Sequence, residues 1–312
     1  MTPDGSVSVV IPSYNRRQLV GGAIDSVLAQ TRSAAEIIVV DDGSSDGTSE
    51  WLALTYGDAV RCIVQDNGGV AAARNTGIDA ARSDYVAFLD SDDRWPQEKL
   101  ALQMPLMAEP GIQLSATNWQ WEDEDSDGFS NSGHVQSRRY VTLTDPLLRL
   151  CHPRGHGILI QTCIIRRDVL VRLGGFDHRL RIAEDMDLIF RVADEGAFKL
   201  ISDILMTRGK DEHTGNLTDI KSVNWQIENF ENTIGILKNT LTRGIKRSAG
   251  ARKAAKARLV QLISYRAMLA ARQGDLAGTR AVCRQALPHL GLTRPSLICL
   301  VGIMVPQVLA RK

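Results

Sequence analysis

The chain has 312 residues, 44% hydrophobic and 23% charged, which predicts a globular protein of one large or two modest domains and excludes a mostly disordered or fibrous chain. Its longest apolar stretch, residues 297–309, is shorter than the roughly 20 residues of a membrane-spanning helix. No basic segment precedes the first apolar run, so no secretory signal is expected. The five cysteines form no CxxC pair, which argues against a zinc ribbon or a disulfide framework.

The net charge of +1 conceals a strong asymmetry along the chain. Residues 238–312 contain 15 Lys and Arg but a single acidic residue, Asp275, and so carry a charge of +14. The first 237 residues contain the other 22 basic and 35 acidic residues, a charge of −13. This segregation predicts that the C-terminal part faces something anionic.

In the first hundred residues, short apolar runs alternate with amphipathic segments. The runs end at Pro, Asp or Gly and are rich in β-branched residues, which is typical of buried strands. Strands are therefore predicted at residues 7–12, 36–41, 60–65 and 85–89, and helices at residues 16–29 and 49–56 and between residue 70 and about residue 82. This alternation is typical of βαβ units and predicts an α/β fold with a mostly parallel sheet flanked by helices.

The rest of the chain is less regular. Strands are predicted at residues 112–117 and 158–165, a mobile acidic loop at 119–133, and an amphipathic helix at 184–194. After residue 217 the pattern predicts helices only, so an all-helical C-terminal extension is expected.

Polar clusters follow three of the predicted strands directly. They are Ser13-Tyr14-Asn15, Asp41-Asp42 and Asp90-Ser91-Asp92-Asp93. Ligands of open α/β sheets bind outside the carboxyl ends of the strands. We therefore expect the three clusters to meet at one carboxylate-rich crevice.

Each cluster has a functional and a plain structural interpretation. Three carboxylates in four residues repel one another unless a cation lies among them, and Mg²⁺ and Mn²⁺ prefer oxygen ligands. The structural alternative is a solvated acidic turn before a helix at Pro96. Asp42 has a carboxylate that can accept a hydrogen bond from a base, or it belongs to an ordinary Asp-Gly turn. Tyr14 can stack on a base, or it packs against the fold.

Taken together, these motifs resemble the nucleotide-binding half of a family 2 glycosyltransferase of the GT-A fold. The matching segments, in chain order, are VSVVIPSYNR, SVLAQT, EIIVVDDGSSDGT, NGGVAAARNTGI and YVAFLDSDDRWPQEKL. A later segment, GGFDHRLRIAEDMDLIFRVADEG, resembles the acceptor-side motif of the same family. The resemblance covers about residues 6–215, and it implies a catalytic domain at residues 1–216, with a nucleotide-binding half (1–110) and an acceptor-side half (111–216), followed by a basic helical region at 217–312.

The resemblance implies roles for individual residues. Asp92 would bind a Mn²⁺ or Mg²⁺ ion between the two phosphates of the donor, and His213 would contact the metal or a phosphate. The remaining residues would contact the nucleotide or its ribose: Pro12, Tyr14, Asp42, Arg74, Asp90 and Ser91. Asp185 would be the general base that deprotonates the acceptor hydroxyl; the alternative is that Asp185 and Asp187 are ordinary acidic residues in the first turn of a helix.

The implied activity is an inverting, metal-assisted transfer of a sugar from a nucleotide diphosphate sugar, a UDP-sugar above all, to a hydroxyl of a glycan or lipid-linked acceptor in cell-surface polysaccharide or glycoconjugate biosynthesis. The alternatives are a sugar-nucleotide nucleotidyltransferase and a non-catalytic nucleotide-sugar-binding protein. Trp95, Trp119 and Trp121 are candidates for stacking on acceptor rings, or else core residues.

The basic segment from residue 238 onward allows two interpretations. It contacts an anionic membrane surface, which would place a cytoplasmic protein peripherally on the inner face of the cell membrane, or it packs as a helical bundle on the acidic domain. Nucleic-acid binding is not expected, because no nucleic-acid motif and no interleaved aromatic residues are present.

Overall fold

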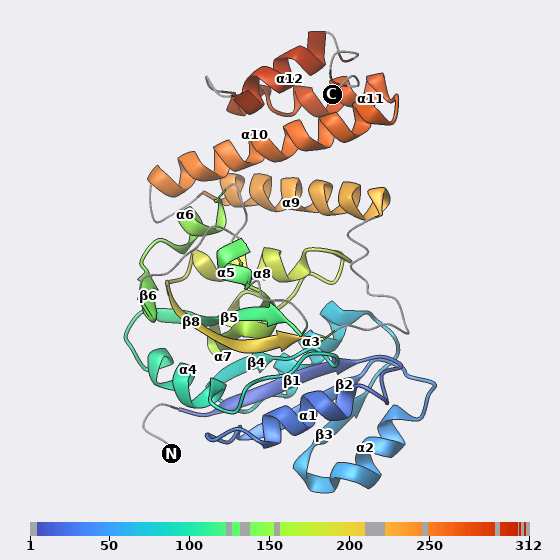
Figure 1. Cartoon of the computed structure of the whole chain (residues 1–312), viewed down its shortest axis with the longest axis vertical. Helices are drawn as coiled ribbons and strands as arrows, with labels where there is room; N and C mark the ends of the chain where they lie inside the picture. The colour runs from blue at the N-terminus through green and yellow to red at the C-terminus, as the bar shows by residue number, and fades with distance from the viewer. Residues whose placement is uncertain are drawn as a thin grey trace. The chain divides into compact units, whose positions relative to one another are not determined.

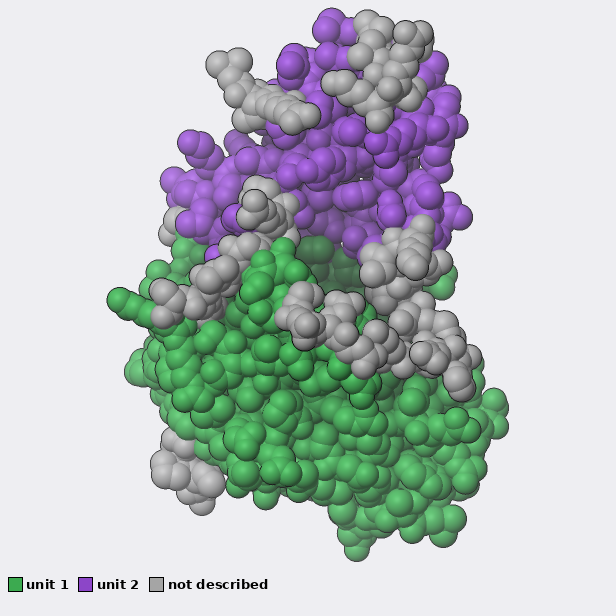
Figure 2. Space-filling view, viewed as in Figure 1, with its two compact units in different colours: residues 1–146, 156–214 green, residues 147–155, 215–312 purple. Residues whose placement is uncertain are grey.

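The computed structural model describes residues 5–122, 127–131, 138–152, 157–209, 222–244, 249–290, 294–304, 306 and 309. The chain divides into two compact units, one made of residues 1–146 and 156–214 and the other of residues 147–155 and 215–312 (Figure 2). The boundary expected between residues 216 and 217 falls outside the described residues and stays a prediction.

The first unit is built on one eight-stranded sheet (Figure 1), with the strand order β3-β2-β1-β4-β7-β5-β8-β6. The strands are β1 (Val7–Ser13), β2 (Glu36–Asp41), β3 (Arg61–Val64), β4 (Tyr85–Phe88), β5 (Ile112–Trp121), β6 (Tyr140–Leu143), β7 (Cys163–Arg166) and β8 (Ala197–Arg208). Strands β1 to β4 are parallel, and so is the β5–β8 pair, whereas β7 and β6 run antiparallel to their neighbours. The sheet is thus mostly parallel, as predicted.

Helices cover both faces of this sheet because alternate residues of a strand point to opposite sides. Val9 and Ile11 of β1 pack with Ile24 of α1 in one cluster of buried side chains. Val10, between them, faces α3, where a Cβ on Gly77 would come within 2.2 Å of its side chain. The helices of this unit are α1 (Val20–Leu28), α2 (Thr48–Tyr56), α3 (Val70–Ala80), α4 (Lys99–Met107), α5 (Gly128–Asn131), α7 (Arg167–Arg172) and α8 (Glu184–Ala193), with short 3₁₀ turns η1 (Gly57–Ala59) and η2 (Ile160–Thr162).

The sheet brings the three polar clusters to one edge. Strands β2, β1 and β4 are adjacent and parallel, so Asp41, Ser13 and the segment after Phe88 leave the sheet at the same end. The strand order reverses at β1, since β2 lies on one side of it and β4 on the other, and ligands of α/β sheets bind at such a switch point. The predicted crevice position is confirmed at the level of topology.

Several elements differ from the sequence-based expectation. The loop expected at 119–133 is partly regular, because β5 continues to Trp121 and α5 follows. Residues 158–165 contain η2 before the strand β7, and α1 begins at Val20, after a turn in which the Leu19 and Val20 amides donate to the Arg16 carbonyl. Strands β6 and β8 were not predicted.

The second unit is helical in the part of the chain that the structure describes. Its elements are α9 (Val223–Arg243), α10 (Ala249–Arg272), α11 (Leu276–Arg284), η3 (Leu287–His289) and α12 (Arg294–Met304), and α6 (Pro146–Leu150) stands at the junction of the two units in the sequence. Two side chains cap helix starts: Ser222 accepts from the Trp225 amide, and Asp275 accepts from the Gly278 amide. Among the described helices, none has the length and apolar character needed to cross a bilayer.

Candidate active site

An acidic cluster lies just after β4, at the switch point of the sheet. Asp90, Asp92 and Asp93 each offer one carboxylate oxygen, and these oxygens lie within 4.8 Å of one another. Burial, followed by repulsion from Asp90 and, for Asp93, also from Asp92, raises the pKa of both Asp92 and Asp93. A divalent cation would relieve this repulsion with the oxygen ligands that Mg²⁺ and Mn²⁺ prefer, so the donor set fits such an ion. Ser91 is buried within the same turn.

The end of β8 holds this acidic turn in place. The backbones of Arg94 and Thr207 exchange two hydrogen bonds of 2.9 and 3.0 Å, and the Gly209 amide donates to Asp93 Oδ1 at 3.1 Å. A Cβ on Gly209 would lie 1.9 Å from the Asp92 carbonyl oxygen, so only glycine allows this approach without a shift. This contact was not predicted because no strand was expected at residues 197–208.

A buried arginine connects the acidic turn to the acceptor-side motif. Arg74 of α3 is 3% exposed; its Nη2 donates to Asp90 Oδ1 at 2.7 Å and its Nη1 to Glu184 Oε1 at 2.8 Å. Its guanidinium also lies over the ring of Phe176, 5.4 Å from the centroid. Gln161 of η2 donates a further hydrogen bond to Asp90. Arg74 was expected beside the nucleotide; the structure shows it bridging two carboxylates.

Burial and ion pairing act in opposite directions on Asp90. Burial alone would raise the pKa of its carboxyl group, but the adjacent Arg74 and the hydrogen bonds from Arg74 and Gln161 outweigh it and leave the pKa below its usual value. Asp90 is therefore a carboxylate at neutral pH. Because Arg74 holds one of its oxygens, the side chain has a fixed orientation at the edge of the sheet.

The acceptor-side carboxylates begin helix α8. Ala183, which precedes the helix, has the left-handed φ of 67°, and Glu184 and Asp185 form the first turn. Burial and repulsion from Asp185 raise the pKa of Glu184 to about 7, with Arg74 opposing them. Burial likewise raises the pKa of Asp185, against Arg74 and the Met186 amide, which donates to Asp185 Oδ1 at 2.7 Å.

Asp187, by contrast, is structural. Its carboxylate forms an ion pair with Arg191 one turn along α8, at 2.7 Å. Arg191 in turn donates to the carbonyl oxygens of Leu173 and Gly175 and so anchors the preceding turn. The two acidic residues that the sequence placed together at this helix start therefore have different surroundings.

The Arg74 bridge brings the two predicted halves of the site together. Asp90 belongs to the acidic turn, and Glu184 is the sequence neighbour of Asp185, so both motifs lie within reach of one guanidinium group. Asp185 is close enough to Asp90 for their charges to affect each other. The carboxyl groups that were predicted to act on donor and acceptor are thus neighbours in one region of the first unit.

On the nucleotide side, the predicted residues have different surroundings. Pro12 is buried opposite Val40 of β2, whereas Tyr14 is 49% exposed at the strand end. Asp42 is 3% exposed and holds the loop before α3: its oxygens accept from the amides of Gly68 and Gly69, at 2.9 and 2.7 Å, and from Gln65 at 2.7 Å. Its contact with a base stays a prediction.

Two polar atoms at the same edge lack a hydrogen-bond partner among the described residues. They are Ser13 Oγ, at the end of β1, and Asp41 Oδ2, at the end of β2, and both are buried. Buried polar groups are normally hydrogen-bonded, so an unpartnered pair at a sheet switch point is consistent with a polar ligand there. Neither residue was singled out individually from the sequence.

The remaining candidates are placed as follows. His213 lies outside the described residues. Trp95 belongs to the core, and its Nε1 donates to the Gln161 carbonyl oxygen at 3.1 Å. Trp119 packs against the same core and donates to the Gly157 carbonyl oxygen, and Trp121 carries the guanidinium of Arg208 over its ring at 4.4 Å. Trp95 is therefore a core residue and offers no stacking surface.

The chain is similar to known proteins in both sequence and structure. Residues 8–174 match the sequence model of Glycosyl transferase family 2. The Escherichia coli protein UDP-Glc:alpha-D-GlcNAc-diphosphoundecaprenol beta-1,3-glucosyltransferase WfgD is 37% identical over 119 residues, which are 38% of this chain and 47% of that protein. Curated relatives are matched over part of their length: the chain spans 20% of one from Rickettsia felis and 66% of one from Rickettsia typhi.

Two solved structures share the fold at low sequence identity. Staphylococcus aureus TarS 1–349 in complex with UDP-GlcNAc has a TM-score of 0.58 and 20% identity, over 92% of this chain and 93% of that one. The mannosyltransferase PcManGT from Pyrobaculum calidifontis, in complex with GDP-Man and Mn²⁺, has a TM-score of 0.60 and 20% identity, over 98% of this chain and 86% of that one. The acidic turn, the GT-A-type sheet and the sequence match agree, and the chain belongs to glycosyltransferase family 2.

Proposed function

We propose that this glycosyltransferase moves a sugar, with inversion, from a nucleotide diphosphate sugar to a hydroxyl of a glycan or lipid-linked acceptor. The observation that carries the proposal is the Arg74 bridge, which joins Asp90 of the acidic turn to Glu184, the sequence neighbour of Asp185, at one guanidinium group. A donor held at the acidic turn would then have its anomeric carbon within reach of a base on α8.

Asp90, Asp92 and Asp93 are the residues that would hold a Mn²⁺ or Mg²⁺ ion. When bound, such an ion supplies charge neutralisation to the departing diphosphate. The chain's own contribution is positional: Gly209 and Thr207 hold the acidic turn, and Arg74 and Gln161 fix the Asp90 carboxylate. The nucleotide would lie over the ends of β1 and β2, where Tyr14 can stack on the base. The buried Ser13 Oγ and Asp41 Oδ2, which have no hydrogen-bond partner among the described residues, could bond to the nucleotide there.

Asp185 is the proposed general base. Its raised pKa makes it a stronger base than an exposed aspartate, and the positive charge of Arg74 opposes the rise and favours the ionised carboxylate. It would take the proton of the acceptor hydroxyl as that oxygen attacks the anomeric carbon, on the face opposite the leaving diphosphate. Inversion follows from this geometry.

A UDP-sugar donor and a role in cell-surface polysaccharide or glycoconjugate synthesis are supported by what similar proteins act on and bind. WfgD acts with UDP-Glc on a diphosphoundecaprenol-linked sugar, and TarS was solved with UDP-GlcNAc. A lipid-linked acceptor would place a cytoplasmic enzyme at the inner face of the membrane, with residues 238–312 toward anionic lipid. A nucleotidyltransferase is disfavoured, since the chain has Ser13-Tyr14-Asn15 at the end of β1, where such an enzyme would need a glycine-rich loop for the triphosphate.

The direct test is a panel of UDP-, GDP- and dTDP-sugars, each added with and without Mn²⁺ while the melting temperature of the full chain is followed. A UDP-sugar should raise the melting temperature in the presence of Mn²⁺, and Asp92→Asn should abolish the increase. Asp58→Asn, which removes an exposed carboxylate far from the acidic turn in the sequence, serves as the control and should keep it. If no nucleotide sugar stabilises the wild-type chain, the proposal fails.

A further inference from the structure

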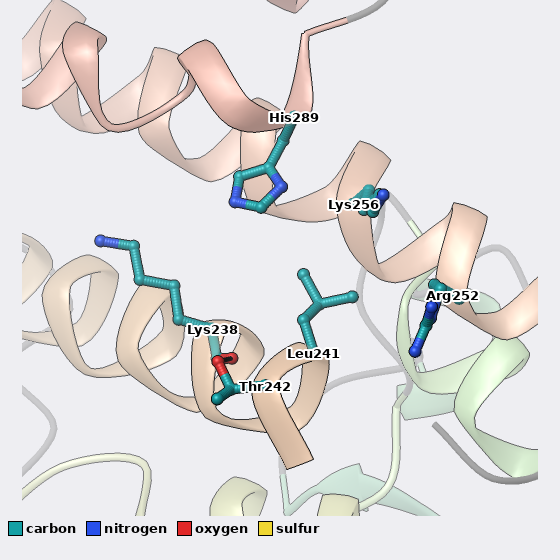
Figure 3. Close-up of a pocket in the computed structure, with 6 residues that line it drawn as sticks. All are labelled: Lys238, Leu241, Thr242, Arg252, Lys256 and His289. Atoms are coloured by element: carbon teal, nitrogen blue, oxygen red, sulfur yellow. Dashed lines mark hydrogen bonds between the residues drawn. The ribbon is translucent and has the colours of Figure 1, made fainter. Parts of the chain in front are cut away.

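The second unit contains a cavity of about 300 Å³ between α9, α10 and η3 (Figure 3). Its lining residues come from three different helical segments: Lys238, Leu241, Thr242, Arg252, Lys256 and His289. Lys238 and Leu241 belong to the last turns of α9, Arg252 and Lys256 to α10, and His289 to η3. The volume is at the lower end of the range typical of small-molecule sites.

The lining is cationic and contains no carboxylate. Three of the six lining side chains carry a positive charge. Lys238 Nζ donates to Gln285 Oε1 at 2.6 Å, a neutral partner, and no acidic partner for Arg252 or Lys256 exists among the described residues. Elsewhere on α10 an acid is available, since Arg266 pairs with Glu231 at 2.9 Å. Among the described residues, the exposed Arg252 and Lys256 therefore have no acidic partner.

The positive charges of Lys256 and Lys238 affect the pKa of His289. Burial, followed by repulsion from Lys256 and Lys238, lowers the pKa of its imidazole. Its Nδ1 is buried and has no hydrogen-bond partner among the described residues. Like charges gathered around a half-buried imidazole oppose folding unless something anionic offsets them.

The side chains that line the cavity are suited to binding phosphate groups. Arginine presents a planar fork that matches phosphate oxygens, lysine adds compact point charges, and an imidazole N–H can donate a further hydrogen bond. Three positive charges balance the two to three negative charges of a diphosphate group. The lining contains no Phe, Tyr or Trp side chain, so it has none of the large aromatic rings on which a nucleobase would stack. We propose that this cavity binds a phosphate- or diphosphate-bearing anion, independently of the nucleotide-sugar site in the first unit.

Such an anion has two sources, a phospholipid or lipid-diphosphate headgroup at a membrane surface and a soluble phosphate compound. Both present the same phosphoryl oxygens to Arg252 and Lys256. The aliphatic Leu241, drawn between the basic side chains in Figure 3, would contact the part of the ligand next to the phosphate. The two sources are separated by the test below.

The test uses isothermal titration of the full chain with pyrophosphate, in EDTA so that no divalent ion occupies the acidic turn. The pocket variant Arg252→Gln/Lys256→Gln is compared with Arg243→Gln/Lys253→Gln, which removes two likewise exposed charges, one from α9 and one from α10, that do not line the cavity. We expect the pocket variant to bind pyrophosphate at least tenfold more weakly than the wild type and the control variant to remain within twofold of it. Equal weakening in both variants, or no binding to the wild type, overturns the proposal.

A second arm identifies the source. Sedimentation with phosphatidylglycerol vesicles, against phosphatidylcholine vesicles, is measured for the same proteins. If only the pocket variant loses vesicle binding, the headgroup is the ligand; if both double variants sediment alike while pyrophosphate affinity differs, the ligand is a soluble phosphate. Asp92→Asn separates this proposal from the proposed function, because it should abolish the Mn²⁺-dependent effect of the donor and leave pyrophosphate binding in EDTA unchanged.

Discussion

The two units of the chain differ in whether their cations have acidic partners. In the first unit the buried cation Arg74 has two carboxylate partners, at 2.7 and 2.8 Å, and these connect motifs far apart in the sequence. In the second unit the cations around the cavity gather without a described acidic partner. A buried charge with close partners, such as Arg74, stabilises the fold. Clustered charges of one sign, as at Asp92 and Asp93 and around the basic cavity, favour a ligand of the opposite sign.

The largest effect is expected when the buried cation of the first unit is removed. Arg74→Met leaves Asp90 and Glu184 without their shared partner, and breaking a buried ion pair costs about 3–5 kcal/mol. We expect the free energy of unfolding in urea, measured at pH 8, to fall by about this amount. Arg82→Met, an exposed arginine two residues after α3, is the control and should change it by less than about 0.5 kcal/mol. A small loss for Arg74→Met would mean that the bridge is not a structural connection.

Two glycines give the next contrast. A Cβ on Gly209 would meet the Asp92 backbone at 1.9 Å, while Gly235 of α9 has nothing within 4 Å. Gly209→Ala should therefore displace the acidic turn, with an overpacking cost of about 1–3 kcal/mol and a weaker Mn²⁺-dependent shift of the melting temperature. Gly235→Ala should stabilise its helix by up to about 1 kcal/mol. Thermal unfolding of both variants checks the contrast, and equal melting temperatures would contradict the close contact between Gly209 and the acidic turn.

These contacts also show what the sequence could and could not predict. Strands β1 to β4 were predicted because each is a short, continuous apolar run closed by a turn signal, and their order placed Asp41 and Asp90 at one edge. Strand β8 was missed because polar residues interrupt its apolar pattern and its partners β5 and β6 are distant in the sequence.

Long-range pairing also explains the missed site residues. The hydrogen bond between Arg74 and Glu184 joins positions 110 residues apart, and no local sequence pattern predicts it. One feature of the sequence could have identified Glu184 as a site residue: it is the acidic neighbour of Asp185 at the start of a predicted helix. Gln161, which donates to Asp90 from a 3₁₀ turn, had no such feature.

The pH dependence of stability tests the raised pKa of Glu184 in the first unit. The pKa of Glu184 is raised to about 7 in the folded chain, so the folded state holds this proton more tightly than the unfolded state, whose pKa is near 4.5. The resulting stabilisation is present below pH 4.5 and is lost as the pH rises toward 7. Melting temperatures between pH 4.5 and 8, recorded in EDTA, should therefore fall less steeply for Glu184→Gln than for the wild type. Parallel curves would contradict the raised pKa.

The smallest effect is expected at the basic cavity. Lys256→Gln removes one of several like charges, so the free energy of unfolding should stay the same or rise by up to about 0.5 kcal/mol. Arg266→Gln on the same helix breaks the pair with Glu231 and should lower it by up to about 1 kcal/mol. Urea unfolding at low salt checks both. A destabilised Lys256→Gln would show that the cavity charges have partners of their own.

The most direct test of the account is nucleoside diphosphate release by Asp185→Asn, measured with the donor that stabilises the wild-type chain. The account predicts a turnover about 10²–10⁴ times slower, with the Mn²⁺-dependent melting shift retained, because the variant loses a base and keeps its donor site. Asp187→Asn removes the same charge from the same helix turn and should retain turnover. Wild-type turnover by Asp185→Asn would contradict the account.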